Sequence, residues 1–158
     1  MLVRDMTPAD WPEVARIYAD GLETRVATFE TEVPSWEAWD AAHLSRPRLV
    51  VDLDGVVAGW IAVSPVSRRP AYRGVVEHSV YVDSRARRRG VGQTLLEALV
   101  AVAPASGIWT IQTSIIAANE ASLRLHDAVG FRLVGRRERI AQLDGVWLDT
   151  LLLELRLP

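Results

Sequence analysis

The hydrophobic pattern near the middle of the chain changes its period within a few residues. Over residues 76–83 apolar positions, joined by His78, alternate with polar ones, as in a strand with two different faces. The polar face carries Glu77, Ser79, Tyr81 and Asp83. From Gly92 to Val102 leucines and valines recur at helical spacing. The pattern predicts a strand, a glycine-containing turn and a helix.

The rest of the chain divides into short strands and helices. Before the central strand we expect a strand over 2–6, a helix from Thr7 to about residue 22, a polar loop over 23–34 and a helix from Ser35 that ends before Pro47. A hairpin of strands 49–53 and 56–63 and an irregular segment over 65–74 complete this part. After the central helix we expect a strand over 108–115, a helix over 120–129 and a closing hairpin of strands 131–141 and 146–157. This order predicts an α+β fold in which helices flank a mixed, mostly antiparallel sheet. Residues 1–158 are expected to form one domain.

Composition removes several classes of function. The formal net charge of -2 gives no electrostatic basis for binding nucleic acid or an anionic membrane, and no apolar run has the length of a membrane span. The three histidines are dispersed and there is no cysteine, so the sequence offers no metal-ligand spacing and no cysteine nucleophile. We expect a soluble cytoplasmic protein without a metal.

The turn over residues 87–92 reads Arg-x-x-Gly-x-Gly. A glycine-rich turn at the start of a helix presents unpaired backbone N–H groups and the positive end of the helix dipole, which together suit phosphate oxygens. The nucleotide-triphosphate loop needs a Gly-Lys-Ser/Thr ending, and this chain has no lysine. The dinucleotide fingerprint needs a third glycine, where Leu95 stands here. A different phosphorylated ligand is therefore expected.

Two sets of polar residues near this turn are candidates for chemistry. Glu77 is an acid in an otherwise apolar strand, which is costly unless the side chain is solvated, paired or functional. As a base it would take the proton of an attacking ammonium; the alternative is a structural residue facing solvent or paired with an arginine. Asn119, Ser122 and His126 share one stripe of a helix. The structural alternatives are that Asn119 is only an N-cap and His126 a surface or satisfied histidine.

The arginine–glycine turn, placed after a strand carrying Glu77 and before an amphipathic helix, resembles the acyl-CoA pyrophosphate loop of the GNAT N-acetyltransferase superfamily. The segment from Asn119 to Phe131 resembles the GNAT segment whose asparagine contacts the pantetheine arm. GNAT enzymes usually have a tyrosine at the place of His126, as the acid that protonates the CoA thiolate. Histidine there matches the phosphinothricin acetyltransferase-like branch, as do Thr28-Phe29-Glu30, the strand from Glu77 to Val82 and Gly145-x-Trp147-x-Asp149.

The resemblance implies a GNAT fold, acetyl-CoA as co-substrate and direct acetyl transfer, with Glu77 and His126 as catalytic residues. The cofactor-binding residues that it implies are Val80, Tyr81, Val82, Arg87, Arg88, Arg89, Gly90, Val91, Gly92, Gln93, Thr94, Asn119 and Ser122. A backbone N–H near Val80 or Tyr81 would stabilise the oxyanion. Gly92 is expected to stay small because its backbone would approach the pyrophosphate.

The branch further implies that the acetyl acceptor is the α-amine of a small amino-acid analogue such as phosphinothricin, methionine sulfoximine or methionine sulfone. Arginines suit the carboxylate of such a substrate, and the substrate-binding candidates are Phe29, Glu30, Arg69, Tyr72 and Arg73. Trp147 is a further candidate for the pocket wall, and a homodimer is implied. Two alternatives stay open: an acetyltransferase for protein N-termini or polyamines, and a non-catalytic acyl-CoA-binding module.

Overall fold

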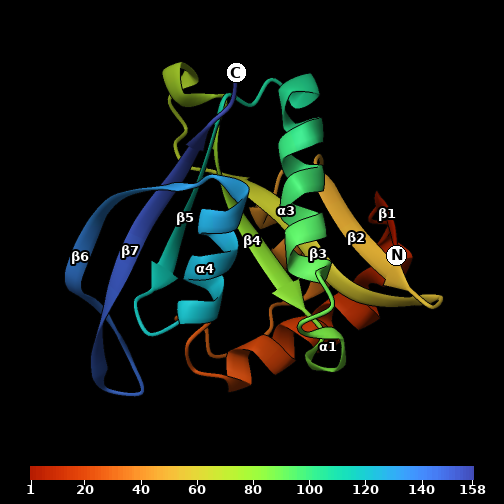
Figure 1. The fold of residues 1–158 in the computed structure, drawn as a ribbon, viewed down its shortest axis with the longest axis horizontal. Coiled ribbons are helices and arrows are strands. Elements are labelled where there is room, and N and C mark those ends of the chain that lie inside the picture. Colours follow the sequence, from red (N-terminus) through yellow and green to blue (C-terminus); the bar gives the residue numbers. More distant parts are fainter.

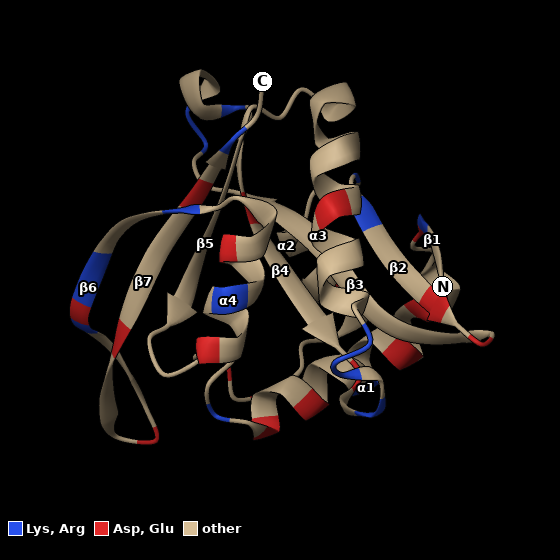
Figure 2. Cartoon of the chain, viewed as in Figure 1, with Lys and Arg blue, Asp and Glu red and all other residues tan.

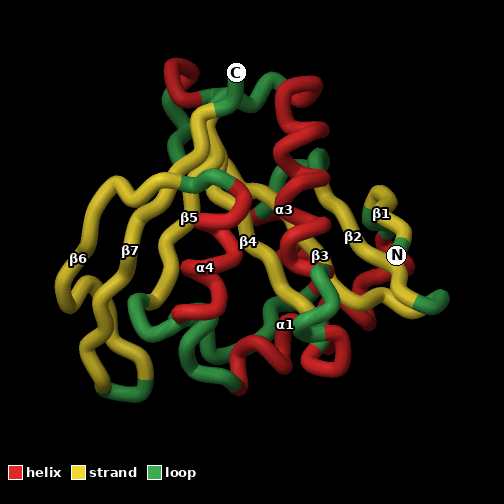
Figure 3. Tube along the Cα trace, viewed as in Figure 1, coloured by secondary structure: helices red, strands yellow, loops and turns green.

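The computed structural model describes residues 1–158 and contains one seven-stranded sheet with four α-helices (Figure 1). The strands are β1 (Leu2–Asp5), β2 (Arg48–Leu53), β3 (Val56–Pro65), β4 (Val75–Val82), β5 (Thr110–Ile116), β6 (Arg132–Leu143) and β7 (Val146–Arg156). The helices are α1 (Trp11–Glu23), α2 (Trp36–Ala42), α3 (Val91–Val102) and α4 (Glu120–Val129). The predicted order of elements is confirmed (Figure 3).

The sheet has the strand order β1-β2-β3-β4-β5-β7-β6. Every neighbouring pair is antiparallel except β4 and β5, which run parallel. The parallel pair is joined by the crossover through α3, as a parallel connection requires. The expected mixed and mostly antiparallel sheet is therefore confirmed.

The first helix begins later than its predicted start at Thr7. Residues Pro8–Asp10 form a short 3-10 turn, and α1 starts at Trp11. A helix from Pro8 would place Pro12 in its interior, where the ring would clash with the carbonyl group four residues earlier. Asp10 instead accepts a hydrogen bond from the Thr7 N–H at 2.7 Å, which closes the turn before the helix begins.

Alternate residues of β3 enter two separate apolar clusters on the two faces of the sheet. Ile61 and Val63 belong to the larger cluster, which α3 covers with Leu95, Leu96 and Leu99. Trp60 and Ala62 belong to the smaller cluster beneath α1 and α2, which also contains Trp39, Val14 and Ile17. The sheet is thus buried on both sides, with α3 and α4 packed next to each other over one face.

The parallel strands β4 and β5 are hydrogen-bonded over only part of their length. Their register pairs Val75–Glu77 with Thr110–Gln112 and stops there, whereas β4 stays paired with β3 as far as Val82. Beyond Glu77, the edge of β4 that faces β5 has no strand partner. The two strands therefore open a wedge in the middle of the sheet (Figure 1).

Candidate functional site

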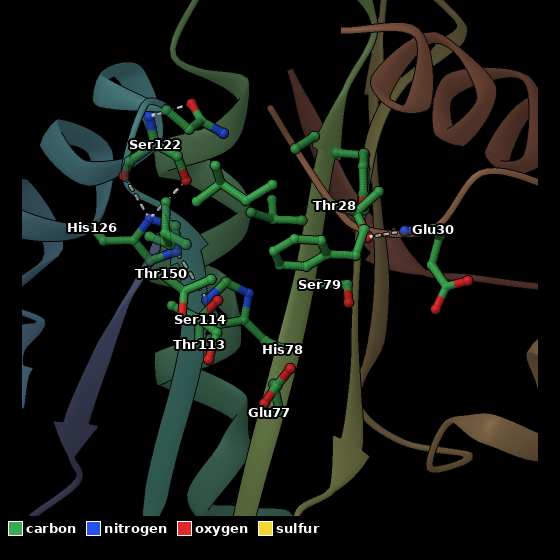
Figure 4. Close-up of a pocket in the computed structure, with 17 residues that line it drawn as sticks. Thr28, Glu30, Glu77, His78, Ser79, Thr113, Ser114, Ser122, His126 and Thr150 are labelled. Atoms are coloured by element: carbon green, nitrogen blue, oxygen red, sulfur yellow. Dashed lines mark hydrogen bonds between the residues drawn. The ribbon is translucent and has the colours of Figure 1, made fainter. Parts of the chain in front are cut away.

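A cavity of about 280 Å³ lies in the wedge between β4 and β5. Figure 4 shows Ser122 and His126 of α4 on one side of it, and Thr28 and Glu30 from the loop after α1 on the other. Glu77, His78 and Ser79 of β4 lie between them. Three segments distant in sequence therefore meet where the sheet opens.

Eight of the residues singled out from the sequence line this cavity. They are Phe29, Glu30, Glu77, Val80, Tyr81, Asn119, Ser122 and His126. The long loop after α1 thus supplies part of the wall.

The predicted phosphate turn and the arginine-rich loop lie outside the cavity wall. Val82 is the last residue of β4 and residues 87–94 come after it, whereas Arg69, Tyr72 and Arg73 precede the start of the strand. The guanidinium of Arg73 lies 5.4 Å above the centre of the Trp109 ring, and the Tyr72 side chain is exposed. Trp147 is exposed on the β6–β7 hairpin beneath the Arg139 guanidinium and also lies outside the wall.

The turn before α3 has the backbone geometry of an anion-binding helix start. Arg88 and Gly90 both adopt positive φ, 61° and 81°, and the first helix bond of the turn runs from Thr94 N–H to Gly90 O at 3.0 Å. The N–H groups of Val91, Gly92 and Gln93 donate to no protein acceptor. Figure 2 shows basic residues concentrated on this turn at the base of α3. The arrangement suits phosphate oxygens.

Gly92 is constrained by a neighbouring helix. A Cβ at this position would lie 2.9 Å from Leu125 Cδ2 of α4. The packing of α3 on α4 is therefore one reason for a small residue at position 92, and the approach of the cofactor to this residue stays a prediction.

Glu77 is half-buried in the wall of the cavity, and its carboxylate has a neutral partner. Gln112 Nε2 donates to Glu77 Oε2 at 3.3 Å across the last paired position of β4 and β5. No arginine forms an ion pair with it, so the structural alternative of an arginine partner is wrong. The other carboxylate oxygen has no hydrogen-bond partner in the protein, as a proton acceptor requires.

The N-terminus of α4 has the polar stripe expected from the sequence. Asn119 Oδ1 accepts a hydrogen bond from the Ser122 N–H at 3.2 Å, which makes Asn119 the N-cap. His126 Nδ1 lies 2.7 Å from the Ser122 carbonyl oxygen and 3.3 Å from Ser122 Oγ. His126 is 1% exposed, so the alternative of a surface histidine is wrong. Burial lowers the pKa of His126.

His78 belongs to the same site and was not identified from the sequence. Its Nε2 lies 3.0 Å from His126 Nε2, the two rings stack, and the residue is 3% exposed. Burial, and next the neighbouring His126, hold the pKa of His78 well below its ordinary value. The only sequence signal was a histidine among the apolar positions of a strand. That signal says nothing about which helix packs above it.

Tyr81 contributes more than its backbone to the site. Its ring stacks on Trp60 and meets the edge of Tyr18 at a centroid distance of 4.8 Å. Burial, and next Tyr18, raise the pKa of the Tyr81 phenol. The phenol therefore stays protonated and can serve as a hydrogen-bond donor at the cavity.

The structure contains no group of three or more His, Cys, Asp or Glu side chains placed to hold a metal ion. None of its helices has both the length and the apolar character needed to cross a bilayer.

Comparison with known proteins gives one consistent result. The sequence model of the acetyltransferase (GNAT) family matches residues 11–131. The chain is 35% identical to an L-methionine sulfoximine/L-methionine sulfone acetyltransferase of Pseudomonas paraeruginosa, over 98% of this chain and 94% of that protein. It is 34% identical to a phosphinothricin N-acetyltransferase of Streptomyces viridochromogenes, over 93% of this chain and 82% of the relative.

A solved structure shares the fold and about a third of the sequence. It is a GNAT superfamily phosphinothricin acetyltransferase from Sinorhizobium meliloti in complex with acetyl-CoA, with a TM-score of 0.88 and 32% identity, covering 99% of this chain and 88% of that one. The wedge in the sheet, the family match and this similarity agree. This chain belongs to the GNAT acetyltransferase family.

Proposed function

We propose that the protein transfers the acetyl group of acetyl-CoA directly to the α-amine of a small amino-acid analogue. The observation that carries the proposal is the cavity in the β4–β5 wedge, which brings Glu77 and His126 together from separate elements. An acyl-CoA-binding module would need the phosphate turn and Asn119 but no acid–base pair. The printed activities of the relatives agree with an amino-acid analogue as substrate.

The residues present fit an acyl-CoA. Backbone N–H groups at the start of α3 are free for phosphate oxygens, and the unpaired edge of β4 over residues 80–82 is free to hydrogen-bond an extended arm. Asn119 and Ser122 would meet that arm from α4. When bound, acetyl-CoA supplies an activated thioester carbonyl for the amine to attack.

Glu77 has the role of base. The α-amine is cationic near neutral pH and cannot attack until it loses a proton, which the free oxygen of Glu77 would accept directly or through water. A backbone N–H of β4 near Val80 or Tyr81 would stabilise the developing oxyanion. His126, at the opposite wall, would supply the proton that the departing thiolate takes.

For the substrate carboxylate, our candidates are Arg73 and, as the second choice, Arg69. Both lie in the loop that leads into the Glu77 strand. Arg73 would have to leave its place over Trp109 or bind from there. Loss of one charge-assisted contact should cost about 2–3 kcal/mol, or roughly 30- to 150-fold in kcat/KM.

The test is acetyl-CoA turnover, followed by thiol release, against free amino-acid analogues, their methyl esters, peptides and polyamines. We expect methionine sulfone or phosphinothricin to be acetylated and the corresponding esters to react poorly. Arg73→Ala should lower kcat/KM for the free acid until it is about equal to the kcat/KM for the methyl ester. The KM for acetyl-CoA should be unchanged. Equal turnover of acid and ester by the unmodified enzyme would favour a peptide or polyamine substrate. Acetyl-CoA binding without any turnover would favour the binding module.

A homodimer is part of the same proposal. Large apolar side chains are exposed along the β6–β7 hairpin, namely Leu133, Val134, Ile140, Val146 and Trp147, and β6 is an edge strand of the sheet. An exposed apolar edge of this kind favours pairing with a second chain. A cytoplasmic location stays a prediction from the sequence.

A further inference from the structure

The ring of Tyr81 is held in one place by its neighbours on β3 and α1. It stacks on Trp60 at a centroid distance of 5.0 Å and meets the edge of the Tyr18 ring. Gly21 of α1 leaves room for it, because a Cβ at that position would lie 2.5 Å from Tyr81 Cδ1. A ring packed on three sides has little freedom to turn. The position of its hydroxyl group is therefore set before a ligand binds.

The Tyr81 hydroxyl group is open to the cavity. Tyr81 is one of the lining residues, and its oxygen is not among the fully buried polar atoms that lack a hydrogen-bond partner. Burial, and next Tyr18, raise the pKa of the phenol. The oxygen therefore keeps its proton at neutral pH and can donate it to a ligand in a hydrogen bond.

Thr28 brings a second hydroxyl group to the same part of the wall from the loop after α1 (Figure 4). Its Oγ1 accepts a hydrogen bond from the Glu30 N–H at 3.1 Å, which leaves its own proton free to be donated. Burial has the largest influence on the pKa of Tyr81, and a hydrogen bond with Thr28 partly offsets it, so the two hydroxyl groups lie close together. Hydroxyl protons turn about their C–O bonds, and both can point to the oxygens of one ligand group.

The wall around these hydroxyl groups carries negative charge and no cation. Glu30 and Glu77 are the only acidic or arginine side chains among the lining residues, and burial lowers the pKa of both lining histidines. The charge of Glu30 acts at the phenols. After burial it raises the pKa of Tyr18, and behind burial and Tyr18 it also raises that of Tyr81. An anion held at these hydroxyl groups would meet the same repulsion.

We propose that the hydroxyl groups of Tyr81 and Thr28 recognise the side-chain head of the acetyl acceptor, and that this head is a neutral oxygen-bearing group such as a sulfone and not an anionic phosphinate. The inference rests on the proposed acetyl transfer and narrows its substrate class. It also gives the side chain of Tyr81, a residue expected to act through its backbone, a role in specificity.

The spacing along β4 fits a substrate of this length. Glu77 and Tyr81 lie on one face of a strand that pairs regularly with β3, so their Cα atoms are about 13 Å apart. An extended methionine sulfone spans about 6 Å from its amine nitrogen to a sulfonyl oxygen, and a hydrogen bond at each end adds about 3 Å. The amine can therefore lie at Glu77 while the sulfone lies at the Tyr81 hydroxyl group.

Three acceptors that differ only at the head test the proposal. Methionine has a bare thioether, methionine sulfone has two neutral oxygens, and phosphinothricin carries a phosphinate anion of the same shape as the sulfone. For the unmodified protein we expect kcat/KM for the sulfone to exceed that for methionine by about tenfold or more, because methionine loses two hydrogen bonds. It should exceed that for phosphinothricin by at least about threefold. Equal values for sulfone and methionine, or a higher value for phosphinothricin, would overturn the proposal.

Substitutions at the two hydroxyl groups locate the recognition. Tyr81→Phe keeps the ring and should lower the ratio of kcat/KM for sulfone to that for methionine by about 3- to 10-fold. Thr28→Val should lower the same ratio, whereas Thr28→Ser should keep it. Tyr18→Phe is the matched control, because Tyr18 touches the Tyr81 ring but does not line the cavity, and it should leave the ratio unchanged. An unchanged ratio in Tyr81→Phe, or an equal fall in Tyr18→Phe, would exclude recognition by the Tyr81 hydroxyl group.

Glu30→Gln tests the selection against an anion. It should lower the ratio of kcat/KM for sulfone to that for phosphinothricin by about threefold, a modest factor because Glu30 is exposed and water screens its charge. The ratio of sulfone to methionine should stay near its value in the unmodified protein, because neither head is charged. A sulfone-to-phosphinothricin ratio that does not change would exclude Glu30 as the cause of the selection.

Binding distinguishes a failure of this proposal from a failure of the proposed function. Calorimetry on the protein saturated with CoA measures the affinities of methionine sulfone and methionine without turnover. Tighter binding of the sulfone that Tyr81→Phe removes would support recognition of the head, even if the protein acetylates none of the three compounds. Equal affinities, or no binding of either compound, would overturn it even if acetyl transfer to another amine is observed.

Discussion

The two faces of β4 carry different chemistry one residue apart. Glu77 faces the loop after α1 and hydrogen-bonds Gln112, whereas His78 faces α4 and hydrogen-bonds His126. In an ordinary strand such neighbours could not serve one site, because successive side chains point to opposite faces. They serve one cavity here because β5 separates from β4 just beyond Glu77.

Glu77→Gln tests the base. The amide keeps the volume and the contact with Gln112 but cannot accept the amine proton, and loss of a general base typically costs about a hundredfold or more. The loss in kcat/KM should be greatest near neutral pH and shrink at high pH, where solvent deprotonates the amine. Thiol-release rates from about pH 6.5 to 9.5 measure this. Gln112→Leu is the matched control; it removes only the neighbouring hydrogen bond and should affect the rate much less. Wild-type rates for Glu77→Gln at every pH would exclude the role.

Asp83 joins α1 to the end of β4 through a buried carboxylate. It is 3% exposed and accepts hydrogen bonds from Arg85 Nη2 at 2.7 Å and Arg16 Nη2 at 2.5 Å. The hydrogen bond from Arg85, and further bonds that include Arg16, hold the pKa of Asp83 well below its ordinary value. A carboxyl whose pKa is lower in the folded state stabilises the protein above its unfolded pKa, about 3.9. That stabilisation declines as the pH falls below this value toward the pKa of the folded state.

Asp83→Asn should therefore lower the free energy of unfolding at pH 7 by about 2 kcal/mol. The difference between the wild type and the variant should shrink as the pH falls from about 4 toward 2.5, because the Asp83 carboxyl of the unfolded wild-type chain takes up a proton there. Urea unfolding followed by tryptophan fluorescence at several pH values measures it. A difference that stays constant over this range would mean that the stabilising contact is not ionic.

At the scale of elements, the packing of α3 on α4 couples the phosphate turn to the polar stripe of α4. Gly92 of the turn lies against Leu125, one residue before His126. A side chain at position 92 would push apart the two helices that carry the proposed binding groups. This steric contact within the protein adds to the expectation that the cofactor approaches position 92, which stays a prediction.

Gly92→Val should destabilise the fold by overpacking, by about 1–3 kcal/mol. Leu125→Ala removes the atoms that the new valine side chain would meet, so the double variant should have a higher Tm than Gly92→Val alone. Thermal unfolding of the two single variants and the double variant measures the coupling. A Gly92→Val protein with unchanged Tm and weakened acetyl-CoA binding would support the cofactor explanation and contradict the steric one.

At the scale of the whole molecule, the sheet ends in two unlike edges. β1 is short, whereas β6 is long and exposes several apolar side chains. We predict that the protein is a homodimer in solution, with twice the chain mass by light scattering during gel filtration. Trp147→Glu, which places a charge where a side chain is now 48% exposed, should shift the mass toward the monomer. Tyr72→Glu, in an exposed loop at the other end of the sheet, is the control. A monomer in the unmodified protein would contradict the prediction.

Local features of the sequence were enough to predict most of the architecture. Alternation, helix caps and turn residues are properties of neighbouring positions, so the order of strands and helices, the α3 turn and the Asn119 cap were all predicted. The wrong helix start at Thr7 also has a local cause. The cap signal at Thr7 favours a helix from Pro8, but such a helix would contain Pro12 in its interior. Glu77 could be chosen as a base because an acid in an apolar strand is unusual in any fold.

The wedge and the histidine pair were decided only by the tertiary structure. His78 and His126 are 48 residues apart, and their contact depends on how α4 packs over β4. The point at which β4 leaves β5 depends on a register between strands joined through α3. Packing likewise brings Phe29 and Glu30 into the cavity wall while leaving Arg69, Tyr72 and Arg73 outside it. The sequence by itself determined which elements form and which residues bear the chemistry. The long-range packing of those elements decided which of these residues meet, because no local pattern encodes a contact between distant segments.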